Sequence, residues 1–106
     1  MNSKDEHTLD LIRSAINIKN SDAEVILFGS RARNNANKES DWDVLILLNM
    51  PFVDRNTEKE YREELFNVEL MTGEAISTFV FSKNDWETKH SISPLFQNIQ
   101  QEGIRL

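Results

Sequence analysis

Residues 28–47 read FGSRARNNANKESDWDVLIL, and this stretch decides the fold. Gly29 and Ser30 follow an apolar segment and predict a turn, while two acids, Asp41 and Asp43, open a second apolar segment. Side chains two residues apart on a β-strand point to the same face. We therefore expect the two carboxylates to lie side by side, opposite a turn that can hold phosphate.

Three segments of the chain have the composition of β-strands, with β-branched, aromatic or aliphatic residues bounded by turn formers. They cover residues 24–28, 42–48 and 75–82. The second segment is apolar almost throughout, which predicts burial on both of its faces. Between the first two strands, residues 31–38 are expected to hold one short helical turn followed by an Asn-rich loop.

Three helices are predicted from apolar spacing and from the residues that begin and end helices. The first begins at Ser3, which pairs with Glu6 in a capping box, and Thr57 pairs with Glu60 in the same way at the start of the second. The last begins at Ser93, which a proline follows. The order α-β-β-α-β-α predicts an α/β (α+β) fold in which helices back a small mixed sheet.

Length and composition limit the classes of protein that this chain can be. Its 106 residues predict one domain over 1–106, with 39% hydrophobic and 28% charged residues. The longest apolar run is too short for a bilayer, no signal pattern opens the chain, and the absence of cysteine fits a reducing cytoplasm. The net charge of −6 argues against bulk nucleic-acid binding and favours a nucleotide or a protein as the partner.

The residues of the turn and of the second strand fit the requirements of phosphoryl-group transfer, which are a phosphate cradle, a divalent metal and an in-line nucleophile. Gly29 lets a phosphate approach the backbone, and Ser30 supplies a hydroxyl. The two aspartates are hard oxygen ligands of the kind that Mg²⁺ takes together with substrate phosphates. Arg31 and Arg33 can offset triphosphate charge. Each piece alone is more often a simple turn, a solvated strand edge or a surface charge; their conjunction carries the interpretation.

The pattern GSRAR at 29–33, followed by SDWDV at 40–44, resembles the signature of the DNA polymerase β-type nucleotidyltransferase superfamily, and most closely that of the minimal nucleotidyltransferases (MNT). The resemblance implies a palm-like fold in which Gly29 and Ser30 hold the triphosphate, beside the charge that Arg31 and Arg33 supply. Asp41 and Asp43 would bind Mg²⁺, with two ions accommodated, and an NTP, expected to be ATP, would be the substrate. Minimal nucleotidyltransferases often act as antitoxins beside a HEPN-domain protein, which implies such a partner here.

Two residues depart from the pattern of that family. Asn34 stands where a glycine is common, and asparagine tolerates positive φ. The family's third carboxylate, on the next core strand, corresponds here to Ser77, with Glu74 nearby but just before the strand and out of register. A serine hydroxyl is neither a good base nor a good metal ligand at neutral pH.

These observations leave two main hypotheses. The first is an Mg²⁺-dependent transferase that moves NMP, expected to be AMP from ATP, to an acceptor hydroxyl. The second is a catalytically weak or inactive protein of the same fold that neutralises or scaffolds a partner by contact; a structural domain with a coincidental motif is a third. Phe96, Ile99 and Ile104 either pack in the core or form an apolar surface for a homo-oligomer.

Overall fold

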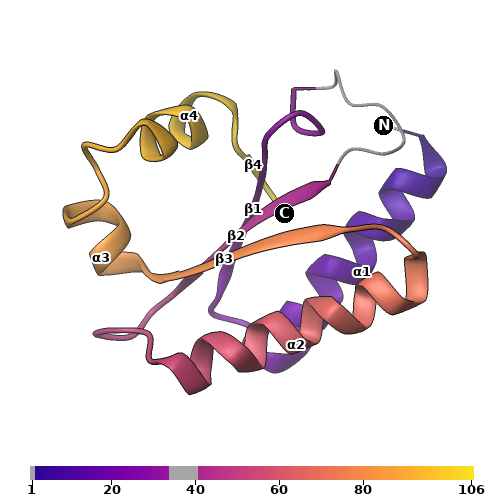
Figure 1. The fold of residues 1–106 in the computed structure, drawn as a ribbon, viewed down its shortest axis with the longest axis horizontal. Coiled ribbons are helices and arrows are strands. Elements are labelled where there is room, and N and C mark those ends of the chain that lie inside the picture. The colour runs from indigo at the N-terminus through magenta and orange to yellow at the C-terminus, as the bar shows by residue number, and fades with distance from the viewer. Residues whose placement is uncertain (1, 34–40) are drawn as a thin grey trace.

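The computed structural model describes residues 2–33 and 41–106, which form a mixed four-stranded sheet between two pairs of helices (Figure 1). This architecture confirms the predicted fold class. The elements, in chain order, are α1 (Ser3–Lys19), β1 (Glu24–Phe28), β2 (Trp42–Leu48), α2 (Arg55–Thr72), β3 (Ile76–Ser82), α3 (Lys83–Thr88), α4 (Pro94–Glu102) and β4 (Ile104–Arg105).

The order of the strands places Asp43, near the start of β2, between β1 and β3, and Asp41 lies directly before β2. The sheet runs β3-β2-β1-β4, with β1 antiparallel to β2 and β3 parallel to β2. Asp43 pairs with Phe28 on one side and with Ser77 on the other. The end of β1 and the starts of β2 and β3 therefore lie side by side at one end of the strands.

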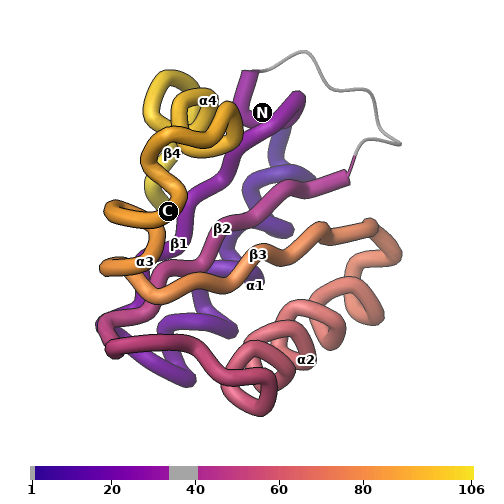
Figure 2. The backbone as a smooth tube through the Cα atoms, turned by 60° about the vertical axis from the view of Figure 1, so that its left-hand side comes forward, coloured from indigo at the N-terminus to yellow at the C-terminus, as the bar shows by residue number. Residues whose placement is uncertain are grey.

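Each face of the sheet packs against its own pair of helices (Figure 2). On one face, Trp42, Val44 and Ile46 of β2 belong to a core that α1 and α2 complete. On the other, Leu45 and Leu47 pack with residues of α3 and α4. Burial of β2 on both faces is thus confirmed, and the odd-numbered residues of β2, Asp43 among them, face α3 and α4.

The predicted N-caps of the first two helices were wrong, although α1 does begin at Ser3 as expected; α2 begins at Arg55, two residues before Thr57. Asn2 caps α1, accepting a hydrogen bond from the Asp5 N–H at 2.8 Å. Asp54 caps α2 in the same way, accepting from the Thr57 N–H at 2.7 Å. Asn and Asp are at least as good N-caps as Ser and Thr, and each lies three residues before the amide that it bonds. The residues of the predicted capping boxes therefore lie inside the helices and do not cap them.

Two short elements were not predicted. Ser82 caps α3 through the Asp85 N–H, and Trp86 of this helix is buried against the second core. β4 pairs with Ile26 and Leu27 at the edge of the sheet, and two residues give no periodicity to detect. The expected loop over residues 34–38, with Asn34, lies outside the described residues.

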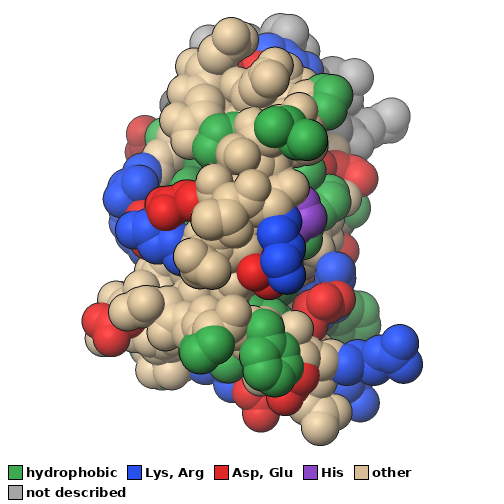
Figure 3. Space-filling view, turned by 90° about the vertical axis from the view of Figure 1, so that its left-hand side faces the viewer, with side chains coloured by type: hydrophobic (Ala, Val, Ile, Leu, Met, Phe, Trp, Pro, Cys, Tyr) green, Lys and Arg blue, Asp and Glu red, His purple; other side chains and the backbone are tan. Residues whose placement is uncertain are grey.

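The apolar residues near the C-terminus divide between core and surface. Ile99 is buried and Phe96 packs against the same core, so core packing is confirmed for both, whereas Ile104 is 40% exposed. Charged side chains of both signs are interspersed with apolar ones on the side where α3 and α4 lie (Figure 3). None of the helices in residues 2–33 and 41–106 combines the length and apolar character needed to cross a membrane.

Candidate functional site

Gly29 lies directly beneath the Asp43 carboxylate. Its φ of +79° is a conformation that favours glycine, and the Gly29 carbonyl accepts from the Arg33 N–H at 3.1 Å, which closes a helical turn over the half-buried Ser30. A Cβ on Gly29 would overlap Asp43 Oδ2 and would lie 3.1 Å from Asp43 Cγ. The backbone conformation favours glycine, and a side chain at this position would displace the Asp43 carboxylate, so the turn and the carboxylate are in direct contact.

Asp41, Asp43 and Ser77 lie together on the face of the sheet that α3 and α4 cover. Ser77 is the β3 residue in register with Asp43, and its hydroxyl donates to Asp41 Oδ2 at 3.4 Å. Burial raises the pKa of Asp43, and the neighbouring Asp41 raises it further, while Arg33 lowers it. The pair of carboxylates thus concentrates negative charge in a partly desolvated place, as a cation site requires.

The two arginines of the turn diverge. Arg33 is half exposed, and its guanidinium contacts both carboxylate oxygens of Glu102 on α4, at 3.0 and 3.1 Å. The charge of Arg33 lowers the pKa of Asp43, and α4 packs on the face of the sheet toward which Asp43 points. Arg33 is therefore on the same side of the sheet as the acids.

Arg31 is 6% exposed and lies on the other side, behind β2. Its guanidinium stacks over the Trp42 ring at 4.2 Å and forms ion pairs with Asp5 and Glu74. The Glu74 carboxylate also accepts from the Trp42 indole N–H at 3.2 Å and from the Thr8 hydroxyl at 2.7 Å. The structure therefore does not bring Arg31 or Glu74 to Asp41 and Asp43. Sequence reasoning missed this cluster; the only signal was that Trp42 must face away from its acidic neighbours.

The residues present fit a magnesium ion that is completed by its substrate. Within residues 2–33 and 41–106, no group of three His, Cys, Asp or Glu side chains is arranged to hold a metal ion. Mg²⁺ commonly binds one or two carboxylates and takes its remaining ligands from phosphates and water. Asp41 and Asp43 supply that number, and the open backbone at Gly29 leaves space for phosphate beside them.

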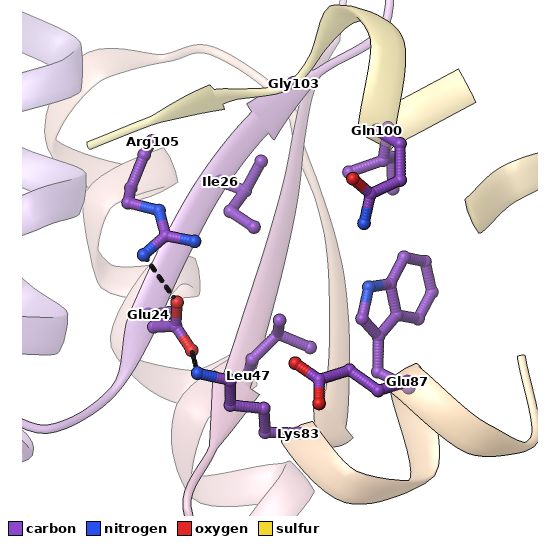
Figure 4. Close-up of a pocket in the computed structure, with 10 residues that line it drawn as sticks. Glu24, Ile26, Leu47, Lys83, Glu87, Gln100, Gly103 and Arg105 are labelled. Carbon is purple, nitrogen blue, oxygen red and sulfur yellow. Dashed lines mark ion pairs between the residues drawn. The ribbon is translucent and has the colours of Figure 1, made fainter. Parts of the chain in front are cut away.

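A pocket of about 260 Å³ lies farther along the same face, beside α3 and β4 (Figure 4). The Glu24 carboxylate forms two ion pairs: Oε2 lies 2.9 Å from Lys83 Nζ, and Oε1 lies 2.8 Å from Arg105 Nη1. The contact with Arg105 does not have the geometry of a hydrogen bond. Glu24 is in register with Leu47, which is four residues along β2 from Asp43. The pocket therefore lies about 13 Å along the strand from Asp43. Because Glu24 neutralises much of the charge of Lys83 and Arg105, we interpret this pocket as a structural feature of the sheet edge and not as a ligand site.

Comparison with known proteins identifies the fold and its family. The family model described as "Nucleotidyltransferase domain" matches residues 9–99. The chain belongs to the nucleotidyltransferase-domain family. This assignment, together with the motif and the fold, fits the minimal nucleotidyltransferases. No match was found among curated protein sequences.

One solved structure extends the comparison to almost the whole of this nucleotidyltransferase domain. It is described as "Crystal structure of the toxin-antitoxin with AMP-PNP" and aligns with a TM-score of 0.57, at 17% identity, over 98% of this chain and 72% of the other. At that identity the similarity establishes the fold alone. The chemistry must be argued from the residues of this chain.

Proposed function

We propose that this chain is an Mg²⁺-dependent nucleotidyltransferase that transfers a nucleoside monophosphate, AMP from ATP, to an acceptor hydroxyl. The observation that carries the proposal is the overlap that any Cβ on Gly29 would have with the Asp43 carboxylate. A turn that serves only to connect two strands has no need to lie against an ionised side chain. A turn that presents phosphate to a carboxylate-bound cation does.

Each residue has a defined part in this reaction. Gly29 and Ser30 bind the triphosphate through the open backbone and the hydroxyl, and Arg33 offsets its charge. Asp41 and Asp43 hold Mg²⁺, which when bound would neutralise the phosphates and orient the α-phosphoryl group. The acceptor oxygen forms a bond to the α-phosphorus, the bond to the β-phosphate bridge breaks, and pyrophosphate leaves. The described residues place Ser77 beside the two acids, so the acceptor's proton passes to solvent or to a group of the acceptor.

We further propose that the acceptor is a protein, the HEPN-type toxin of a cytoplasmic toxin–antitoxin pair. The structurally similar protein is described as a toxin–antitoxin, which supports a protein partner for this fold. The chain itself supports the same view through exposed apolar side chains on α2, where Phe66, Leu70 and Met71 are 54%, 69% and 68% exposed. Such residues on a small domain commonly mark contact surfaces.

The test is label transfer with the chain purified together with its native partner. We expect label from [α-³²P]ATP, and none from [γ-³²P]ATP, to become covalently attached to the partner in the presence of Mg²⁺. The Asp41→Asn/Asp43→Asn variant, which retains the size of both side chains, should transfer nothing. Label from the γ position would indicate phosphoryl transfer and would contradict the proposal.

The position of Ser77 favours a second candidate, a nucleotide-binding protein that neutralises its partner by contact. Ser77 takes the place in register with Asp43 where a third acid would complete the site. Under this hypothesis the wild-type chain transfers no label from either position. The double asparagine variant then binds the partner as tightly as the wild type does, and it protects cells from the toxin equally well.

A further inference from the structure

We propose that Arg31 and Trp42 form a clamp that fixes the Gly29–Ser30 turn relative to the Asp41 and Asp43 carboxylates. Arg31 is then a positioning residue and not a ligand of the nucleotide. The inference rests on the proposed function for its purpose, but its physical content is a statement about this chain alone. The clamp lies on the face of the sheet opposite the candidate site.

The first observation is the position of the two side chains in the sequence. Arg31 directly follows Ser30 of the turn, and Trp42 lies between the two acids. The Arg31 guanidinium carbon is 4.2 Å from the centroid of the Trp42 ring, which is fully buried. A desolvated guanidinium stacked on an indole is among the stronger cation–π arrangements. This contact joins the two halves of the site directly.

The second observation is that acidic side chains hold both members of the stack in place. Glu74 Oε2 accepts from the Trp42 indole N–H at 3.2 Å, and Glu74 Oε1 lies 3.6 Å from the Arg31 guanidinium. Asp5, on α1, lies 3.3 Å from Arg31. The planar, always charged guanidinium can satisfy the ring and two acids at once, and a lysine ammonium cannot. Glu74 thereby fixes the rotamer of Trp42 and the position of Arg31.

A site for phosphate and metal depends on such support. Binding groups must be held within fractions of an ångström, and side chains behind the site supply that rigidity. Asp41 and Asp43 are the chain neighbours of Trp42, so a displacement of the Trp42 backbone would move both carboxylates. Arg31 is buried, and its contacts with the indole and with two acids hold the guanidinium on the face of the sheet opposite the two aspartates.

The test is amide hydrogen exchange measured by NMR on the full chain. Two amides report on the clamp: that of Arg33, which donates to Gly29, and that of Trp42, which donates to Ala75 at 2.9 Å. In Arg31→Lys we expect exchange at both amides to become about tenfold faster, as expected for the loss of one buried contact, with Leu47 unchanged. The matched control is Arg62→Lys, which changes an arginine paired with Glu58 on α2.

Two outcomes would overturn the inference: wild-type exchange at both amides in Arg31→Lys, or an equal acceleration over the whole sheet, which indicates a general loss of stability. If Arg31→Lys does not fold, Glu74→Gln decides by the same comparison, because it keeps an acceptor for the indole and removes the charge facing Arg31.

Titration with ATP and Mg²⁺ separates this inference from the proposed function. If the wild-type chain binds, Arg31→Lys should bind about tenfold more weakly and Arg62→Lys normally. A wild-type chain that binds no nucleotide contradicts the proposed function, and the exchange data still decide whether the clamp exists.

Discussion

Gly29 and Asp43 depend on each other, because the carboxylate of one fills the space that a side chain on the other would need. Asp43 bears an electrostatic cost there, since burial and Asp41 both raise its pKa. Local rules are often broken at functional sites, and the rest of the fold compensates. Substitution of Gly29 and substitution of Asp43 therefore have different expected effects.

Gly29→Ala should abolish nucleotide binding, whereas Gly73→Ala should not affect it. Both glycines have positive φ, +79° and +73°, so alanine costs about 1 kcal/mol of backbone strain at each, a fall in Tm of about 5 °C. A Cβ on Gly73, the C-cap of α2, meets no atom within 4 Å, whereas one on Gly29 meets Asp43. Thermal unfolding and calorimetric titration of both variants measure the two effects. Equal binding by both would contradict this account.

Asp43→Asn should stabilise the metal-free chain at pH 7 and raise its Tm by a few degrees. The folded pKa of Asp43 is raised, so above that pKa the ionised carboxylate destabilises the fold. The penalty disappears as the pH falls through the raised pKa toward the ordinary value of 3.8. The gain in Tm should therefore shrink over that interval in unfolding scans with EDTA.

Asp54→Asn is the control with the opposite sign. Hydrogen bonds from Thr57 lower the pKa of Asp54, so its ionised form stabilises the fold above the ordinary value of 3.8. That contribution is lost as the pH falls through the lowered pKa. Asp54→Asn should consequently lower the Tm at pH 7 and have no effect at the acid end of the scan. The same sign for both variants would show that their environments do not differ as described.

Ser77→Asp tests the third acidic position. Its carboxylate would join two others, because Ser77 is in register with Asp43 and donates to Asp41. We expect a lower Tm than that of the wild type in EDTA and a larger rise on addition of Mg²⁺, since the cation relieves the repulsion. Ser21→Asp, in the exposed turn before β1, is the control and should show neither change. A variant insensitive to Mg²⁺ would place Ser77 outside the metal site.

At the scale of elements, β2 is the central strand whose two faces pack into different cores. Its even-numbered side chains, from Trp42 onward, complete the core beneath α1 and α2. Its odd-numbered side chains begin with Asp43 and continue with Leu45 and Leu47 in the core beneath α3 and α4. The helices of both layers thereby hold the head of one strand in a fixed position.

Glu24→Gln should loosen the edge of the sheet without affecting the site. Glu24 links β1 to Lys83 of α3 and Arg105 of β4, and its side chain is only 18% exposed. Loss of this charge should cost about 1 kcal/mol, less at high salt, because it leaves two cations without their partner. Urea unfolding at two salt concentrations measures the cost. Altered nucleotide affinity in this variant would contradict our assignment of the pocket.

Sequence patterns predicted most elements because each has a repeating signal. The three long helices show apolar spacing, and the first three strands are runs of β-branched and aromatic residues bounded by turns. β1 and β2 were predicted with their observed bounds, Glu24–Phe28 and Trp42–Leu48. β4 and α3, with two and six residues, are too short for an apolar pattern to repeat, and tertiary contacts to β1 and to the second core decide them.

At the scale of the whole molecule, the sequence predicted that Asp41 and Asp43 lie close together, but it did not predict that Arg31 and Glu74 lie on the opposite face of the sheet. Alternation along a strand is enough to bring Asp41 and Asp43 together. The direction of Arg31 depends on the buried Trp42 ring and on Asp5, which lies 26 residues earlier in the chain. Glu74 was considered as a third ligand; its bonds to Thr8 and Trp42 turn it to the opposite face. Long-range contacts of this kind have no local pattern.

The family and the fold extend over nearly the whole chain, but neither establishes catalysis, since one fold can serve both active and inactive proteins. The decisive feature of this molecule is a site with two carboxylates over a glycine turn and a serine in the third place. Nucleotide binding is therefore the property on which both of our functional hypotheses can be built. It is also the property that a coincidental motif would lack.

The most direct measurement is calorimetric titration of the purified chain with ATP, with and without Mg²⁺, beside the Asp41→Asn/Asp43→Asn variant. We predict binding that requires Mg²⁺ and that the variant loses, while circular dichroism shows the variant to be folded. Binding of equal strength without Mg²⁺, or in the variant, would contradict the assignment of the two aspartates. No binding of any NTP by the wild-type chain would contradict the nucleotide site itself.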